Sequence, residues 1–548
     1  MSHFLDGLAQ RARETPSAVA LRWFGGRDGA RVREQVTFAD LAGRVERTAA
    51  TLRAQGLEPG DRVLFSIRPR PEGVILCLAV LRAGGAVVFV DPGSTPELFA
   101  ARLAAAGPRW AATEALLYAA SCGPLRRVAR ARGLLLPDYG RLPVRHLYSG
   151  RWLPGVPRGA RRVARLADGG ARPALAAADL DAVALVVFTS GTTSDPKAVV
   201  HTTRTLGGML DLFRQVGDLR PGQRAHTDQM FLGLPALLAG GTWEIPARTP
   251  REAPEAFARG VAGADASFLV PADVTALLDV LEARGGADVG PAVLAVGAAP
   301  VTPALLARGR RVLPGTRWLA VYGATEILPA AVTDADEKLA AAAEGDLVGR
   351  PLDGIGVRID PSGVEPGVGA VPEPGGDLVG ELVLTGPSLM AGYLADLDAG
   401  RPPAVEHRTG DLAHVDAEGR IVLVGRTRDM IIRGTVNIYP GLFEPRLREL
   451  PGVADAVLVG VPQPDGDERV VLVVTADGGE AGEPGERVRV GTPLVRSVTE
   501  RLADVLDHGA LPDVVVEATH VPLAGRSRKP DRRLLVDWVT PVAGTVRA

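Results

Sequence analysis

The chain has 548 residues, which is too many for one ordinary hydrophobic core, so two or more folding units are expected. It is 46% hydrophobic and 23% charged, and its formal net charge of −2 gives no reason to expect nucleic acid or an anionic membrane as the main partner. The two cysteines, Cys77 and Cys122, exclude a disulfide framework and favour a reducing cytoplasm. The N-terminus lacks a secretory signal pattern, and the longest apolar runs fall well short of the roughly 20 residues of a membrane-spanning helix. We therefore expect a soluble, cytoplasmic protein without a membrane span.

From about residue 37 the chain alternates helical patterns with short β-rich runs. Repetition of this unit predicts a layered α/β fold with mostly parallel strands. The first expected elements are a helix at Phe38–Gln55, a strand at Arg62–Ile67, a helix at Gly73–Arg82 and a strand at Ala86–Val90. Cys77 lies inside the second helix and is expected to pack as a small hydrophobe. The stretch Gly123–Pro173 is rich in Arg, Gly and Pro with weak periodicity, which indicates a surface connection.

The second half of the chain contains a strand at Val183–Phe188 and then a β-rich stretch dense in Gly, Pro and Val at Asp353–Gly380. After the apolar run Ile421–Val424 comes a charged stretch, and the remainder reads as a compact α+β unit. We place the domain boundary there. Residues 1–427 are expected to form a large N-terminal domain of layered α/β subdomains with a small β-rich subdomain, and residues 428–548 a small α+β domain.

A loop with five hydroxyl side chains, one glycine and a terminal lysine follows the strand at Val183–Phe188, from Thr189 to Lys197. Such a flexible, donor-rich loop suits the oxygens of a polyphosphate. It is not the Walker pattern, whose GxxxxGK[ST] spacing is absent. Taken alone, a Ser/Thr-rich surface turn explains the segment equally well.

A second motif, Tyr-Gly-Ala-Thr-Glu, stands at the end of a strand pattern that covers Arg317–Val321. Gly323 permits a tight turn, and Thr325 and Glu326 emerge where strand ends usually hold ligands. A glutamate beside polyphosphate is a suitable Mg²⁺ ligand. Taken alone, the better interpretation is a capped helix that begins at Thr325–Glu326 and continues through Ile327–Ala331.

A third motif, Arg408-Thr-Gly-Asp411, is expected in a loop before a hairpin at Ala413–Val424. An aspartate there is able to accept hydrogen bonds from two ribose hydroxyls. Because Thr-Gly-Asp is also an ordinary turn, the motif is weak by itself.

The order and spacing of these three motifs along the chain are more specific than any one motif alone. Together with Gly297–Pro300, the charged run Gly425–Gly434 and Asn437–Pro440, these motifs resemble the adenylate-forming superfamily. That superfamily comprises acyl-CoA synthetases, the adenylation domains of nonribosomal peptide synthetases, and firefly luciferase. The resemblance runs from about Asp6 to Leu535. It implies an enzyme that joins a carboxylic acid to AMP, consumes ATP with Mg²⁺ and releases pyrophosphate.

The resemblance also assigns roles to individual residues in the large domain. The phosphate loop, with Thr189, Ser190, Gly191, Thr192, Thr193 and Lys197, would cradle the β- and γ-phosphates of ATP. The nucleotide would be bordered by Gly297, Ala298, Ala299 and Pro300 and by Tyr322 and Gly323. Thr325 would contact the α-phosphate and Glu326 the Mg²⁺.

Further roles fall on the last third of the chain. Asp411 would hold the ribose hydroxyls with Arg426 nearby, and Arg428 matches the hinge about which a mobile C-terminal domain rotates. Lys529 would be the catalytic lysine; judged without the resemblance, its basic run would be solvated surface charge. Because Lys197, Glu326, Asp411 and Lys529 are all retained, a non-catalytic nucleotide-binding protein is the remote alternative.

The chain departs from the superfamily pattern at several positions. Ser194 and Ala198 stand where the phosphate loop usually has glycines, and Thr203 replaces a customary histidine. The segment Asp228–Gly241 is compressed and lacks another customary histidine, which is similar to the olefin-pathway β-lactone synthetases. Its apolar part, Met230–Ala239, favours an aliphatic or acyl substrate.

The acceptor of the acyl group is therefore open. Met430–Pro440 looks like the corresponding segment of acyl-CoA synthetases, which favours the thiol of CoA or of the phosphopantetheine on an acyl carrier protein. Closure of a β-lactone by the substrate's own hydroxyl comes next, and amide formation third.

Overall fold

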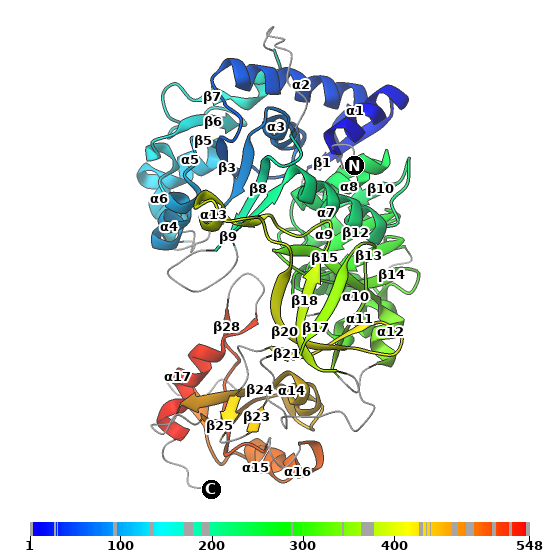
Figure 1. Ribbon diagram of the computed structural model, residues 1–548, viewed down its shortest axis with the longest axis vertical. Coiled ribbons are helices and arrows are strands. Elements are labelled where there is room, and N and C mark those ends of the chain that lie inside the picture. The colour runs from blue at the N-terminus through cyan, green and yellow to red at the C-terminus, as the bar shows by residue number, and fades with distance from the viewer. Residues whose placement is uncertain are drawn as a thin grey trace. The chain divides into compact units, whose positions relative to one another are not determined.

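The computed structural model describes the chain apart from short segments. Those segments are residues 1–3, 27–28, 30, 91–95, 132–135, 169–178, 189–196, 286–288, 300, 342–344, 363–377, 427–430, 434–435, 439, 463–467, 478–486, 507–510, 525–528 and 544–548. The described residues form two compact units (Figure 1). Unit 1 comprises residues 1–335, 352–355 and 385–407, and unit 2 comprises residues 336–351, 356–384 and 408–548. The expected boundary between 427 and 428 lies inside unit 2, at residues outside the described part, and stays a prediction.

The first sheet of unit 1 is mostly parallel, as expected from the alternating pattern. Within the described residues its antiparallel pairs lie at one edge, where β9 pairs with both β8 and β19. In spatial order its strands are β19 (Gly392–Tyr393), β9 (Ala198–Thr202), β8 (Val183–Phe188), β4 (Ala86–Phe89), β3 (Arg62–Ser66), β5 (Trp110–Glu114), β6 (Arg145–Ser149) and β7 (Arg161–Arg162).

The second group of strands in unit 1 is parallel in its middle and has an antiparallel pair at each end. Its strands, in spatial order, are β15 (Ile327–Asp334), β14 (Arg317–Ala324), β13 (Val293–Val296), β12 (Ala266–Leu269), β10 (Arg224–His226), β11 (Thr242–Ile245), β1 (Val19–Gly25) and β2 (Arg31–Thr37). In both sheets a strand that is parallel to one neighbour is thus antiparallel to the next strand of the chain, as β8 is to β9 and β14 is to β15.

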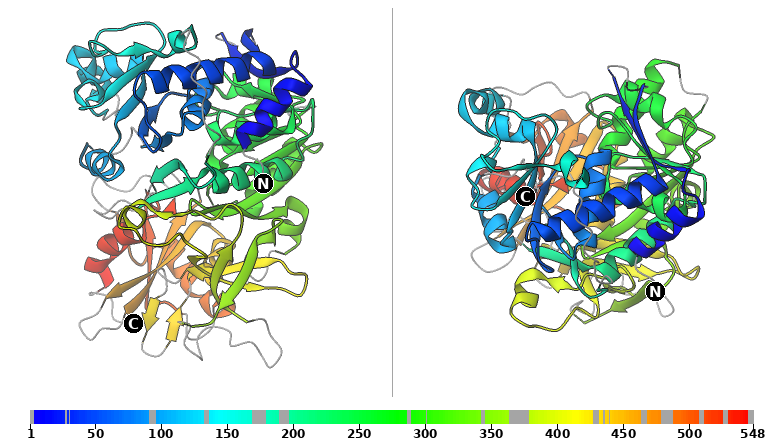
Figure 2. Two further views of the ribbon diagram at one scale, coloured as in Figure 1. Left: turned by 45° about the horizontal axis from the view of Figure 1, so that its top comes forward. Right: turned by 90° about the horizontal axis from the view of Figure 1, so that it is seen from above.

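Helices lie between and around these sheets. The main core contains residues from both sheets and from α1 (Phe4–Glu14), α2 (Phe38–Ala54), α3 (Pro71–Arg82), α7 (Thr203–Val216) and α8 (Met230–Ala239). The helices α2 and α3 lie side by side (Figures 1 and 2). The remaining helices of unit 1 are α4 (Pro96–Ala106), α5 (Ala115–Ser121), α6 (Gly123–Ala131), α9 (Pro254–Val261), α10 (Pro271–Ala283), α11 (Pro303–Val312) and α13 (Leu394–Asp398).

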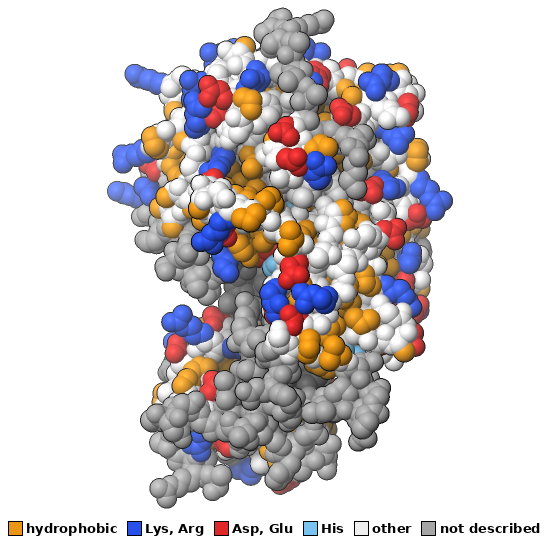
Figure 3. Space-filling view, in the orientation of Figure 1, with side chains coloured by type: hydrophobic (Ala, Val, Ile, Leu, Met, Phe, Trp, Pro, Cys, Tyr) orange, Lys and Arg blue, Asp and Glu red, His pale blue; other side chains and the backbone are white. Residues whose placement is uncertain are grey.

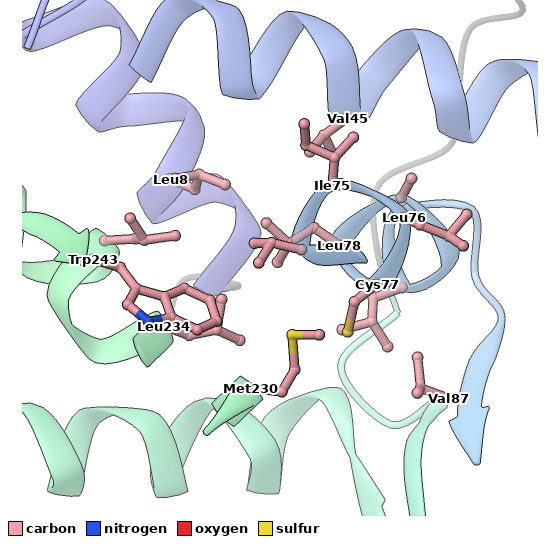
Figure 4. Close-up of a cluster of buried hydrophobic side chains, with 14 of the residues drawn as sticks. Leu8, Val45, Ile75, Leu76, Cys77, Leu78, Val87, Met230, Leu234 and Trp243 are labelled. Atoms are coloured by element: carbon pink, nitrogen blue, oxygen red, sulfur yellow. The ribbon is translucent and has the colours of Figure 1, made fainter. Parts of the chain in front are cut away.

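The helix α8 occupies the compressed segment and is almost wholly buried. Figure 4 shows its side chains in one apolar space with those of α1, α3 and β11, among them Leu8, Cys77, Met230, Leu234 and Trp243. A Cβ at Gly233 would overlap the indole of Trp243, so glycine is what lets the helix approach β11 this closely. Cys77 is 1% exposed, and burial raises the pKa of its thiol to about 12, which confirms its packing role.

The interpretation of Gly123–Pro173 as a surface connection was wrong. The strand β6 extends the first sheet in parallel register with β5, and Tyr139 and Leu147 are fully buried. The two 3₁₀ turns η1 (Tyr139–Arg141) and η2 (Val163–Asp168) add further packed structure. Apolar residues spaced too irregularly for either regular period are buried here by tertiary contacts.

Unit 2 contains a strand group and a separate α+β core. The strand group has β16 (Asp346–Pro351), β17 (Gly356–Asp360), β18 (Gly380–Thr385), β20 (His407–Val415) and β21 (Ile421–Arg426), with α12 (Ala335–Ala340) before it. The α+β core is built on a four-stranded sheet in the order β24 (Val453–Pro462), β25 (Glu468–Ala476), β27 (Val514–Ala518) and β26 (Val488–Arg489). Its helices are α14 (Pro440–Arg448), α15 (Pro493–Thr499), α16 (Leu502–Val505) and α17 (Arg532–Ala543), and two strand pairs accompany it, β22 (Ile431–Arg433) with β23 (Val436–Ile438) and β28 (Leu523–Ala524) with β29 (Lys529–Pro530).

The surface of the described residues carries no marked segregation of charge on the face drawn in Figure 3, where basic and acidic side chains are interspersed. Among the described helices, none combines the length and apolar character that crossing a bilayer requires.

Candidate nucleotide site

The phosphate loop joins two paired strands. Phe188 at the end of β8 lies opposite Ala198 at the start of β9, while residues 189–196, including Thr189, Ser190, Gly191, Thr192 and Thr193, lie outside the described residues. Lys197 directly precedes β9 and is exposed. Ala198 is buried and is the first residue of β9.

The Thr325–Glu326 turn is the tip of an antiparallel hairpin, not the start of a helix. The strand β14 runs to Ala324, which pairs with Ile327 at the start of β15. The expectation of a helix after Glu326 was therefore wrong, because pairing with β14 overrides the capping pattern. A Cβ at Gly323 would lie 2.7 Å from Leu328 Cδ1 and 2.9 Å from the Ile327 carbonyl oxygen, so the glycine serves close approach within the hairpin.

Glu326 is half-buried beside Tyr393 of β19, a residue that the sequence analysis did not identify. The Tyr393 hydroxyl donates a hydrogen bond to Glu326 Oε1 across 3.0 Å. Burial and the neighbouring carboxylate raise the pKa of Tyr393, so the phenol keeps its proton and acts as the donor. Lys197 Nζ lies 5.3 Å from the centroid of the Tyr393 ring. The structure thus gathers Lys197 and Glu326 around one tyrosine.

His201 is a second residue that the sequence analysis missed. It lies in β9 with 2% of its surface exposed, and its Nε2 is 2.9 Å from the Thr325 carbonyl oxygen. Thr203, noted for replacing a histidine, instead opens α7 and is buried. A polar residue in the apolar run of β9, four positions after Lys197, was the available signal for His201.

The predicted adenine segment lies next to the same hairpin. Gly297 directly follows β13, whose Val296 pairs with Ala320 of β14. A Cβ at Gly297 would lie 2.9 Å from the Val321 carbonyl oxygen, one residue before Tyr322. Ala298 has a positive φ of 65°, and Ala299 follows it, while Pro300 lies outside the described residues. Gly297 therefore lies against β14 at the residue before Tyr322.

Unit 2 contains the predicted ribose residues. Asp411 is 4% exposed and pairs with Arg426 across β20 and β21. The expected loop at 408–411 is instead part of β20, with Gly410 at a positive φ of 71° and its N–H donated to Glu381 Oε1 at 3.1 Å. Strand pairing with β21 overrides the turn propensity of Thr-Gly-Asp.

Three further predicted residues, besides those of the phosphate loop and Pro300, are described only in part or not at all. The backbone of Lys529 lies in β29, paired with Ala524, and the backbone of Arg426 lies in β21. Their side chains, and the whole of Arg428, fall outside the described residues. Their assigned roles stay predictions.

The donor set suits Mg²⁺ bound through a nucleotide. Among the described residues, no group of three His, Cys, Asp or Glu side chains gathers into a protein-only metal cage. Glu326 offers a hard oxygen ligand, and within the described residues Oε1 is the carboxylate oxygen that takes a hydrogen bond. Mg²⁺ commonly binds through one or two carboxylates together with substrate phosphates and water, so this arrangement fits the ion.

A cavity of about 330 Å³ lies elsewhere in unit 1. It is lined by Arg22, Phe24, Arg224 and Glu244, among others, and includes no predicted site residue of the described chain. Glu244 Oε1 pairs with Arg22 Nη1 at 2.6 Å. The cavity borders an ion-pair network that connects β1, β10 and β11.

Comparisons with known proteins show the family of the chain. The AMP-binding enzyme family matches residues 8–394. The chain is 30% identical over 557 residues to an olefin beta-lactone synthetase from Xanthomonas campestris pv. campestris, covering 95% of both chains. It is 31% identical over 502 residues to a feruloyl-CoA synthase from an Amycolatopsis species, covering 86% of this chain and 88% of the relative. The fold is similar to that of the amide bond synthetase McbA from Marinactinospora thermotolerans, with a TM-score of 0.74, 24% identity and coverage of 97% and 99%. The match to most of the chain and the arrangement of its motifs establish that this protein belongs to the AMP-binding enzyme family.

Proposed function

We propose that this protein is a ligase that adenylates an apolar carboxylic acid with ATP and Mg²⁺ and releases pyrophosphate. The proposal rests on the contacts of Tyr393 with Glu326 and Lys197. Glu326 follows the end of β14 and Lys197 precedes the start of β9, so both lie where a strand is joined to its antiparallel partner. The chain also belongs to the AMP-binding enzyme family. Ligands of α/β sheets generally bind at the carboxyl ends of parallel strands.

In this proposal each residue assists attack of a carboxylate on the α-phosphorus. Glu326 would hold Mg²⁺, which supplies positive charge beside the phosphates. Lys197 would neutralise terminal phosphate charge at the end of the loop, and Thr325 would contact the α-phosphate. Lys529 would bring a further cation to the charge that develops there. Asp411 would orient the ribose.

Apolar contacts near the phosphate loop support an apolar acid. Phe231 of α8 packs edge-on against Phe89 at the end of β4, with ring centroids 5.7 Å apart. Phe89 in turn pairs with Val187, next to the last residue of β8. The aromatic pair therefore stands beside the strand end from which the phosphate loop leaves, where an acyl chain would be expected.

For the acceptor, we propose β-lactone closure by a hydroxyl on the substrate. Two features support it: the compact, core-packed α8, and the olefin beta-lactone synthetase that is similar over 95% of both chains. In this step the substrate hydroxyl oxygen would bond to the acyl carbon, the acyl–phosphate bond would break, AMP would leave and the hydroxyl proton would pass to solvent.

Transfer to the thiol of CoA or of an acyl carrier protein is the second candidate, and amide formation the third. Thiol transfer has the support of the feruloyl-CoA synthase relative and of the Met430–Pro440 resemblance, and it was the leading expectation from the sequence. The carrier-protein partner, the cytoplasmic location and a mobile domain from residue 428 also remain proposals that rest on the sequence.

The first half-reaction is tested by exchange of labelled pyrophosphate into ATP. We expect exchange that depends on both Mg²⁺ and an added acid, and that is strongest for aliphatic or β-hydroxy acids in a panel. A non-catalytic nucleotide-binding protein would bind ATP without exchange for any acid, and that result would contradict the proposal.

The acceptor is tested by supplying a β-hydroxy acid, ATP and Mg²⁺ without any thiol. We expect many turnovers, with AMP released and a β-lactone detected by mass spectrometry, because the nucleophile belongs to the substrate. The matched acid without the hydroxyl is the control and should stop after one bound acyl-AMP. A stall with the β-hydroxy acid that ends only on addition of CoA or a carrier protein would select the thiol instead.

A further inference from the structure

The Thr325–Glu326 turn is held at three points by partners distant in the sequence. The Thr325 carbonyl oxygen lies 2.9 Å from His201 Nε2. The Glu326 carbonyl oxygen accepts the Met390 N–H at 2.7 Å, and the Glu326 carboxylate accepts the Tyr393 hydroxyl at 3.0 Å. A two-residue hairpin tip thus has both its carbonyls and its one charged group fixed.

Two of these partners stand on neighbouring strands. His201 belongs to β9, and Tyr393 belongs to β19, where Tyr393 pairs with Val199 and Gly392 with Val200. The strand β9 also follows the phosphate loop directly, because it begins at the residue after Lys197. The two side chains therefore connect the turn that carries Glu326 to the strand that ends the phosphate loop.

The chemistry of His201 defines its role as a donor. Burial lowers the pKa of His201, opposed by the Thr325 carbonyl and the Glu326 charge, so the ring is neutral near pH 7. A carbonyl oxygen can only accept, so Nε2 must carry the proton. Nδ1 is then an acceptor, and the Thr205 hydroxyl stands 3.4 Å from it. One tautomer satisfies both contacts.

We propose that His201 and Tyr393 are positioning residues that fasten the Thr325–Glu326 turn to β9, so that the metal-binding carboxylate and the phosphate loop's exit strand keep one fixed geometry. The inference rests on the proposed adenylation and adds to it two residues that act through Thr325 and Glu326. Outer-sphere hydrogen bonds of this kind commonly change metal affinity or activity by about 10- to 100-fold when removed.

The kinetic test uses Tyr393→Phe and His201→Leu, with His201→Gln as the conservative variant. Each of the first two should lower kcat of pyrophosphate exchange by about tenfold or more. Tyr393→Phe should also raise the Mg²⁺ concentration for half-maximal rate, while KM for the acid stays within about twofold, because the proposal assigns neither residue a contact with the acid. His201→Gln places an amide N–H where Nε2 stood and should recover most of the rate.

Matched controls come from the same unit. His146 makes a similar pair of contacts in β6, with Nε2 3.1 Å from the Leu142 carbonyl oxygen and Nδ1 3.0 Å from the Tyr118 hydroxyl. His146→Gln and Tyr148→Phe should leave exchange and its Mg²⁺ dependence unchanged. Thermal unfolding of every variant separates lost positioning from lost folding.

A readout independent of activity is the ¹⁵N NMR signature of the histidine rings. His201 should show a protonated Nε2 and an unprotonated Nδ1 at neutral pH, and the signals should vanish in His201→Gln. A protonated Nδ1, or variants with wild-type kcat and Mg²⁺ dependence while the wild type exchanges normally, would overturn the inference. Absence of exchange in the wild type would refute the proposed function instead.

Discussion

Lys529→Ala is expected to reduce pyrophosphate exchange by on the order of 10²–10³-fold, the loss typical of one preorganised group that stabilises transition-state charge. The side chain is predicted to meet negative charge that builds on the α-phosphate during adenylation. Its backbone lies in the short pair β28–β29, outside the hydrophobic core of unit 2, so folding should be retained. Exchange assays and thermal unfolding measure the two effects separately.

The same variant should still consume acyl-AMP that is supplied to it, because Lys529 is assigned to the first half-reaction alone. Arg533→Ala is the matched control, since Arg533 is an exposed cation four residues away at the start of α17. Exchange within a few-fold of wild type in Lys529→Ala would show that the catalytic lysine is another residue. Equal losses in both variants would point to general surface charge.

Glu326→Gln is expected to lower Mg²⁺-dependent turnover by about 100-fold, because a neutral amide is a poor ligand for a hard cation. The replacement has nearly the same shape, and its amide oxygen is still able to accept the Tyr393 hydroxyl, so the hairpin should persist. The measurement is the exchange rate as a function of Mg²⁺ concentration.

Thermal stabilisation by ATP without Mg²⁺ should hardly change in Glu326→Gln. Glu46→Gln provides the control, because Glu46 lies on the surface of α2 with Arg82 as its partner at 2.7 Å. If the Mg²⁺ dependence of Glu326→Gln matched the wild type, Glu326 would have no part in holding the ion.

The elements that the sequence predicted best are those whose burial and regular period coincide. The strand at Val183–Phe188 and the helix before Gln55 were both expected, because each combines an apolar pattern with clear end signals. The prediction of a helix at Ile327–Ala331 was wrong. Thr325 and Glu326 resemble a helix cap, but pairing with β14 makes the segment a strand. A local sequence pattern does not show with which other strand a segment will pair.

The site residues likewise divide into those that a local motif predicts and those that depend on strand pairing. Lys197, Glu326 and Asp411 were predicted as site residues because their motifs are contiguous in the chain. His201 and Tyr393 were not predicted, because their contacts with the Thr325–Glu326 turn arise only when β9 and β19 pair and lie beside it. A histidine in the apolar run of β9 indicates a buried polar side chain, but it does not identify the distant residue that the side chain contacts.

The chain's path between its two units bears on how such enzymes exchange parts by recombination. Unit 1 is completed by residues 352–355 and 385–407, which return after the chain has entered unit 2. Tyr393 lies in that last returning segment, whereas Glu326, its hydrogen-bond partner, lies in the first. A single crossover anywhere between them would combine a carboxylate from one parent with a tyrosine from another. Functional chimaeras should therefore inherit residues 198–202, 325–326 and 388–393 as one block, although nearly two hundred codons separate the first from the last.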